Sequence, residues 1–188
     1  MTESRVELLS ADEASRIAEE VGVLEPIAQL NVFRVLLHRP QTAKAVADLL
    51  LSMLFGGALD DRLRELVIMR IGWATGSDYE WTQHWTVAQE QFACTPEDLL
   101  AVRDWRDSDR FGPAEQAVLA ATDETLETGS VTASTLADCR KHVGETEVLV
   151  ELITAIGTWR LISQFTRSLE VPLEEGIASW PPEGVGPK

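Results

Sequence analysis

Cysteine is scarce in this chain of 188 residues, and its two cysteines, Cys94 and Cys139, lie far apart in no paired motif. The sequence therefore implies no structural disulfide and favours a reducing compartment. The first ten residues are polar and mixed rather than basic and then apolar, so no signal peptide is indicated. No uninterrupted apolar run is long enough to cross a bilayer. We therefore expect a cytoplasmic protein without a membrane partner.

Basic residues are also few: 16 Lys and Arg stand against 31 Asp and Glu, which gives a formal charge of −15. Nucleic acids and anionic membranes repel such a chain, and neither is an expected partner. The three histidines form no His-x-x-x-His pattern, and Cys-x-x-Cys is missing, so a zinc site is not predicted. Because Gly-x-Gly-x-x-Gly and Walker A patterns are absent too, we expect no nucleotide and no other cofactor.

Strand-type alternation is hard to find, whereas helical spacing of apolar residues runs through most of the chain. The length favours a single domain over residues 1–188. We predict an all-α domain of about eight to nine helices, with a charged loop at 104–111 and an irregular, proline-rich arm at 172–188. The expected helices cover residues 10–21, 26–38, 42–55, 60–76, 78–92, a segment from 95, and 113–128, 132–142 and 145–169.

The most informative stretch is 65–84, which holds Glu65, Glu80 and His84 on two expected helices. Glu80 and His84 are four residues apart, so they share one helical face, and a carboxylate beside an imidazole is a workable acid/base pair. In this interpretation Glu80 accepts a hydrogen bond from one imidazole nitrogen and fixes the tautomer of His84. The alternative is structural, because Ser77 with Glu80 matches a capping box and needs no catalysis.

Glu65 lies on an otherwise apolar helix, so its carboxylate is paired, raised in pKa or at the edge of the buried stripe. An ion pair with a neighbouring arginine is the plain structural interpretation. A single octahedral metal on Glu65, Glu80 and His84 is a further alternative.

Aromatic residues crowd the same stretch and favour a dry apolar pocket, although a packed core explains them as well. Arg160, on the long last helix, is a candidate to bind a substrate carboxylate, and a surface ion pair is its alternative. The candidate pocket residues are Trp73, Ser77, Tyr79, Trp81, Trp85 and Arg160.

This stretch resembles the carboxymuconolactone decarboxylase family, which includes the alkylhydroperoxidase D-like proteins. The redox branch of that family has a Glu, followed twelve residues later by Cys-x-x-Cys-x-x-x-His. Here Glu65 precedes Ser77 by twelve residues, Glu80 stands at the second cysteine, and His84 stands at the histidine. The resemblance covers roughly residues 31–169 and implies an alkylhydroperoxidase D-like helical bundle.

The missing cysteines separate this chain from the redox branch, because Ser and Glu supply neither a thiolate nor a resolving thiol. Thiol peroxidase activity is therefore not expected, although similarity to the family suggests it. The decarboxylase branch implies loss of carbon dioxide from a lactone acid, with a proton delivered to the product. In that chemistry His84 donates or shuttles the proton, Glu80 orients it or acts as the acid if buried, and Glu65 tunes His84 or holds the second proton position.

Two functions remain open. One is a cofactor-independent enzyme that decarboxylates, isomerises or processes a lactone of a small organic acid with Glu65, Glu80 and His84. The other is a non-catalytic helical oligomer or ligand-binding scaffold. The resemblance implies trimers or hexamers with the site near a subunit interface, so the expected partners are a small-molecule substrate and further copies of the chain.

Overall fold

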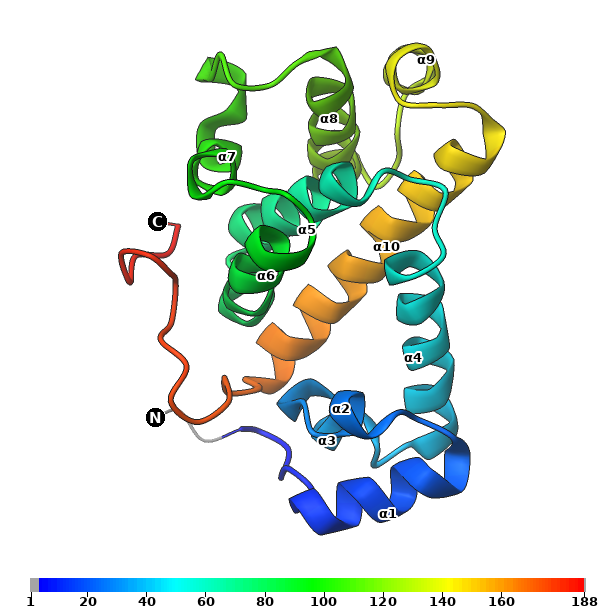
Figure 1. The fold of residues 1–188 in the computed structure, drawn as a ribbon, viewed down its shortest axis with the longest axis vertical. Coiled ribbons are helices and arrows are strands. Elements are labelled where there is room, and N and C mark those ends of the chain that lie inside the picture. Colours follow the sequence, from blue (N-terminus) through cyan, green and yellow to red (C-terminus); the bar gives the residue numbers. More distant parts are fainter. Residues whose placement is uncertain (1–3, 188) are drawn as a thin grey trace. The chain divides into compact units, whose positions relative to one another are not determined.

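The computed structural model describes residues 4–187, and its regular elements are all helices (Figure 1). No strand occurs within this range. The helices are α1 Ala11–Val21, α2 Glu25–Ala28, α3 Asn31–Leu36, α4 Pro40–Leu54, α5 Asp61–Thr75, α6 Asp78–Gln91, α7 Pro96–Ala101, η1 Val102–Asp107, α8 Pro113–Thr128, α9 Ala133–His142 and α10 Thr146–Leu169. The all-α prediction is confirmed.

The predicted and observed helices differ at two places. The segment expected as one helix at 26–38 forms α2 and α3, because Leu30 is extended (ψ 135°) and starts a new helix. The expected loop at 104–111 begins as the short 3-10 helix η1, which is kinked at Asp104. These two differences raise the number of helices above the eight to nine expected.

The described residues form two compact units. The first unit holds residues 4–56 and 165–177, and the second holds 57–164 and 178–187. In the first unit α1 packs against α2 and α4, and Asn31 ties the start of α3 to the segment after α10. Nδ2 of Asn31 donates to the carbonyl of Pro172 at 3.2 Å.

The second unit is built around α5, which packs against α6, α8 and η1. Asp60 caps the start of α5 by accepting from the amide of Leu63 at 3.1 Å. Gly76 ends the helix in the left-handed conformation (φ 67°), which a residue with a side chain adopts only with strain. Nearly every turn of α5 is buried, and this makes it the central helix of the unit.

Helix α10 is the one described helix with the length and composition of a membrane span, with a mean hydropathy of 1.3. Core helices of soluble proteins satisfy the same criterion, so this is weak evidence for a membrane. One face of α10 carries buried Leu152, Ile156 and Trp159, which explains its apolar character. Apolar residues elsewhere on the helix are exposed.

The proline-rich arm contributes residues 178–187 to the second unit. Asp78, in the first turn of α6, accepts from the hydroxyl of Ser179 at 2.6 Å and from the amide of Trp180 at 3.0 Å. The indole nitrogen of Trp81 donates to the carbonyl of Pro181 at 2.8 Å. The arm is irregular, as predicted, but it is fixed to α6.

Candidate functional site

The pairing of α5 with α6 brings the predicted site residues together. Gly72 lets the two helices approach closely, because a Cβ built there lies 3.0 Å from the backbone nitrogen of Trp81. Across this contact Glu65 of α5 reaches His84 of α6, with Oε2 and Nδ1 2.8 Å apart. The candidate site is therefore a bridge between two neighbouring helices.

His84 has a second partner, Trp159 of α10, which is not among the predicted site residues. The indole nitrogen of Trp159 donates to Nε2 of His84 over 3.4 Å, and the two rings are nearly perpendicular at 80°. A carboxylate acceptor at Nδ1 and an N–H donor at Nε2 together select the neutral tautomer that carries its hydrogen on Nδ1. Glu65 and Trp159 therefore fix the orientation of the imidazole.

Glu65, rather than Glu80, is the carboxylate that holds His84. The prediction that Glu80 accepts from an imidazole nitrogen is wrong, because the ring turns across to α5 instead of along its own helix. Glu65 is fully buried and also lies 3.4 Å from Nη2 of Arg64, which is equally buried. The ion pair with a neighbouring arginine, which was the plain structural interpretation of Glu65, therefore occurs together with the contact to His84.

The pKa of His84 reflects opposing influences. Burial disfavours the imidazolium and lowers the pKa, whereas the charge of Glu65 and its hydrogen bond raise it. The net result is a pKa above the ordinary value of 6.5. Glu80 adds a smaller contribution in the same direction.

Glu80 is buried, with 3% of its surface exposed. Desolvation raises its pKa from 4.5 to about 7, against the opposing charge of His84. Ser77 is the residue before α6, but its side chain makes no capping hydrogen bond to the first turn. The capping-box alternative for Ser77 and Glu80 is therefore wrong, and Glu80 is instead a carboxyl group that exchanges its proton near neutral pH.

The aromatic residues of the stretch mainly pack on one another. Trp81 is fully buried, with ring centroids 5.3 Å from Trp73, 5.8 Å from Trp85 and 6.2 Å from Trp180 of the arm. Tyr79 is buried as well. This arrangement corresponds to the packed-core alternative for most of the cluster.

A pocket of about 440 Å³ in the second unit lies elsewhere. Its lining residues are Arg70, Trp73, Ala74, Arg103, Asp123, Leu126, Glu127 and Pro187. Trp73 is the one predicted pocket residue among them, while Ser77, Tyr79, Trp81, Trp85 and Arg160 are not. Glu65, Glu80 and His84 do not line it either.

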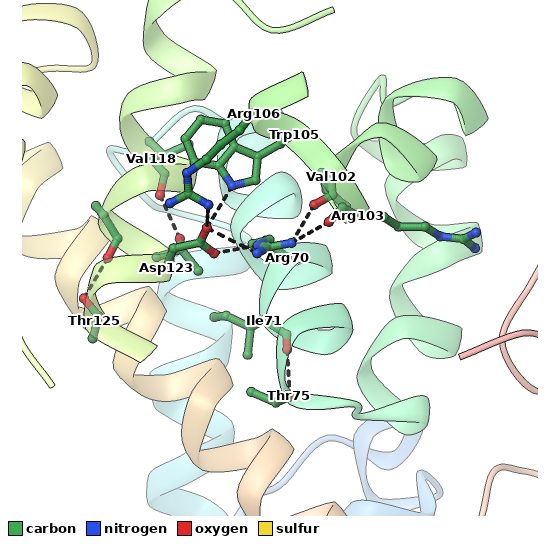
Figure 2. A network of polar contacts seen from close by, with 12 residues as sticks. Arg70, Ile71, Thr75, Val102, Arg103, Trp105, Arg106, Val118, Asp123 and Thr125 are labelled. Atoms are coloured by element: carbon green, nitrogen blue, oxygen red, sulfur yellow. Dashed lines mark hydrogen bonds and ion pairs between the residues drawn. The ribbon is translucent and has the colours of Figure 1, made fainter. Parts of the chain in front are cut away.

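An ion-pair network forms one side of this pocket (Figure 2). Asp123 accepts from Nε of Arg70 at 2.6 Å, from Arg106 at 2.5 Å and from the indole of Trp105 at 3.0 Å. Burial raises the pKa of Asp123, but these donors outweigh it and hold the pKa below the ordinary value. Asp123 is therefore a satisfied structural anion that joins α5, η1 and α8.

Arg160 is exposed, and its Nη1 donates to the backbone carbonyl of Thr125 at 3.3 Å. The structure therefore does not bring Arg160 to Glu80 and His84. Among residues 4–187 no three His, Cys, Asp or Glu side chains are placed to hold a metal ion. Glu65, Glu80 and His84 are therefore not arranged as the ligands of the octahedral metal that was one alternative for them.

Residues 40–124, which include the Glu65–His84 stretch, match the carboxymuconolactone decarboxylase family. The resemblance inferred from the motif is therefore confirmed over this part of the chain. No curated protein matches the chain.

Solved structures similar to this chain share its fold at low sequence identity. The alkylhydroperoxidase AhpD core of an uncharacterized peroxidase-related protein from Ralstonia eutropha JMP134 is 18% identical, covers 93% of this chain and 94% of its own, and has a TM-score of 0.74. The debrominase Bmp8, in complex with 2,3,4-tribromopyrrole, is 16% identical over 92% and 95%, also at 0.74. An uncharacterized peroxidase-related protein from Silicibacter sp. TM1040 is 10% identical over 92% and 90%, at 0.69.

Sequence reasoning missed two residues that shape this region, Trp159 and Arg103. Each lies far along the chain from the side chain it contacts, so no local spacing connects them. The signal available was compositional, because Trp159 is the one tryptophan on the long last helix.

Proposed function

We propose that this protein is an acid/base enzyme that decarboxylates, isomerises or processes a lactone of a small organic acid without thiol chemistry. The observation that supports this is Glu80, a buried carboxyl group with a pKa of about 7, one helical turn before His84. A group that is about half protonated at neutral pH both gives and takes a proton efficiently. It occupies the position where redox relatives carry a cysteine.

Glu80 is the proton-transferring group in this proposal. In a decarboxylation, the bond to the carboxylate carbon breaks, carbon dioxide leaves, and the electron pair stays on the substrate as a dienolate. Glu80 then delivers its proton to carbon and is reprotonated from water. His84 tunes this step, because its charge lowers the pKa of Glu80, and Glu65 in turn favours the charged form of His84.

Peroxide reduction is not proposed, even though similar structures include peroxidase-related proteins. Burial raises the pKa of Cys94 to about 12 and that of Cys139 to about 11, so both remain thiols at neutral pH. The thiolate is the form that attacks peroxides and disulfides. Neither cysteine has a neighbouring thiol in sequence to resolve an oxidised intermediate.

The test is carbon dioxide release from 4-carboxymuconolactone by the wild type and by Glu80→Gln and His84→Ala. The matched control is Glu90→Gln, which makes the same change at an exposed position of α6. We expect turnover by the wild type and the control, and a loss of about 100-fold or more in Glu80→Gln. Turnover that persists in Glu80→Gln would contradict the role of Glu80, and none in the wild type would exclude this substrate.

A ligand-binding scaffold without catalysis is the second candidate, and one observation favours it. The pocket of about 440 Å³ is lined by none of Glu65, Glu80 and His84. For either function we propose a small-molecule partner, assembly of the chain into trimers or hexamers, and a cytoplasmic location, with no cofactor required.

A further inference from the structure

The pocket between α5, η1 and α8 contains one arginine whose donors are incompletely used. The guanidinium carbon of Arg103 lies 4.5 Å from the ring centroid of Trp73 and 5.1 Å from that of Trp81. Its Nη1 donates to Oε2 of Glu183 at 2.9 Å, but Nε and Nη2 are buried and donate to no acceptor. A guanidinium stays charged at every physiological pH, so buried unpaired donors leave a strong demand for an anion.

The other cation of the pocket is already saturated. Arg70 binds Asp123 through Nε and Nη2, and its Nη1 donates to the carbonyls of Val102 and Arg103. Figure 2 shows the side chain of Arg103 extending away from this network, so Asp123 does not serve it. Arg103 is therefore the group in the pocket with donors left for a further acceptor.

The present partner of Arg103 is held loosely. Glu183 offers one oxygen, and 57% of its side chain is exposed. It belongs to the arm, whose Pro187 also lines the pocket. The Arg103 side chain is only 15% exposed, so the pair is open to water mainly on its Glu183 side. Water and salt compete for an exposed carboxylate, so a competing carboxylate displaces Glu183 at modest cost. A free carboxylate also satisfies two guanidinium donors at once, which a single oxygen of Glu183 does not.

We propose that this pocket binds a small carboxylate with a planar apolar body, whose carboxylate takes the place of Glu183 on Arg103 while its body packs against Trp73. The volume of about 440 Å³ lies within the roughly 300–1,000 Å³ typical of small-molecule sites. This site is separate from Glu65, Glu80 and His84, so it does not depend on the proposed reaction.

The experiment is isothermal titration calorimetry with sodium benzoate as the probe and benzamide as its uncharged counterpart. About 0.15 M salt screens the overall charge of −15 beyond roughly 8 Å, which leaves the local contact with Arg103 to decide affinity. We expect benzoate to bind and benzamide to bind at least about tenfold more weakly. Equal affinity for the two probes would overturn the carboxylate assignment.

Two variants test the exchange with Glu183. Glu183→Gln removes the competing carboxylate at an exposed position, and we expect benzoate to bind about two- to five-fold more tightly. Arg103→Lys keeps the charge but loses the planar fork, and we expect about tenfold weaker binding. The matched control, Glu175→Gln, makes the same change at an exposed residue of the C-terminal segment and leaves affinity unchanged. No gain in Glu183→Gln, or no benzoate binding by either protein, would overturn the proposal.

Discussion

At the scale of single residues, the candidate site depends on how His84 is shared between Glu65 and Trp159. Glu65 favours the imidazolium, whereas the indole N–H of Trp159 requires a lone pair on Nε2 and so favours the neutral ring. Protonation of His84 therefore strengthens one contact and breaks the other. Protonation of the imidazole therefore changes both the charge of the site and the contacts that orient His84.

Replacing Glu65 by Gln tests this balance. Without the carboxylate, the burial that already lowers the pKa of His84 is no longer outweighed, so we expect the pKa to fall by at least about one pH unit. Titration of the imidazole nitrogens by NMR measures it, with His38 and His142 as internal references. An unchanged pKa of His84 in Glu65→Gln would show that Glu65 does not control it.

Glu80 makes stability depend on pH. Its pKa rises from 4.5 to about 7 on folding, so between these values the folded protein keeps a proton that the unfolded chain has lost. The stabilisation is complete below pH 4.5 and is lost as the pH rises through 7. Gln does not titrate, so only the wild type loses this stabilisation as the pH rises. From pH 5 to pH 8 we therefore expect the free energy of unfolding of Glu80→Gln to rise by about 2–3 kcal/mol relative to that of the wild type.

Urea unfolding at the two pH values measures this difference. His84 is present in both proteins, so its own contribution largely cancels. Glu90→Gln, at an exposed position of the same helix, should show the wild-type dependence on pH. Parallel curves for wild type and Glu80→Gln would mean that Glu80 is not the group that titrates near 7.

The sequence predicted which titratable residues gather at this site but not which of them touch. Glu65, Glu80 and His84 were found from their spacing, and all three lie on the paired helices α5 and α6. The partner of His84 was assigned along α6, because helical spacing describes neighbours within a helix and not across a helix pair. The contact with Trp159 joins positions 75 residues apart, and no local pattern encodes such a contact.

At the scale of elements, the approach of α5 to α6 determines the geometry of the site. At Gly72 the two helices come close together, and the missing side chain makes room for the backbone of Trp81. A glycine inside a helix is otherwise unfavourable. Its presence on α5 therefore has a packing reason, which a single sequence does not reveal.

Gly72→Ala and Gly157→Ala form a matched pair. At Gly72 a Cβ meets the backbone nitrogen of Trp81 at 3.0 Å, so the helices must separate, and we expect a loss of about 1–3 kcal/mol in the free energy of unfolding. At Gly157 a Cβ meets nothing within 4 Å in the single chain, so we expect a gain of about 0.5–1 kcal/mol. Gly157 lies on the face of α10 proposed below to contact a second copy, so both substitutions are compared in the Ile153→Glu, Leu161→Glu variant, in which that face is free. Urea unfolding measures both, and equal effects at the two positions would contradict the close approach of α5 and α6.

At the scale of the whole molecule, the helical content could be predicted from the sequence, but the division of the chain into two compact units could not. The periodicity of α5, α8 and α10 is long and regular, and their predicted bounds lie within about two residues of those observed. The division into two units depends on which helices contact one another, and the spacing of residues within a helix carries no record of this. Arm residues 178–187 illustrate the point, because composition predicted their irregularity but not their attachment to α6.

Self-assembly is the property of the whole molecule that the resemblance implies, and α10 offers a surface for it. Val150, Ile153 and Leu161 are exposed on one face of this helix, at 63%, 41% and 50%. Apolar surface of this kind on a soluble protein marks contact sites. We propose that a second copy of the chain covers this face in the expected trimer or hexamer.

Light scattering coupled to size-exclusion chromatography measures the assembly directly. We expect the wild type at three or six times the chain mass of 20.8 kDa, and the double variant Ile153→Glu with Leu161→Glu at the mass of one or two chains. Two carboxylates in a buried apolar contact are strongly unfavourable, and the overall charge of −15 adds repulsion between copies. Leu24→Glu changes an equally exposed leucine outside α10 and should leave the mass unaltered. A wild type that elutes as a monomer would exclude the assembly, and a double variant with the wild-type mass would place the contact on another surface.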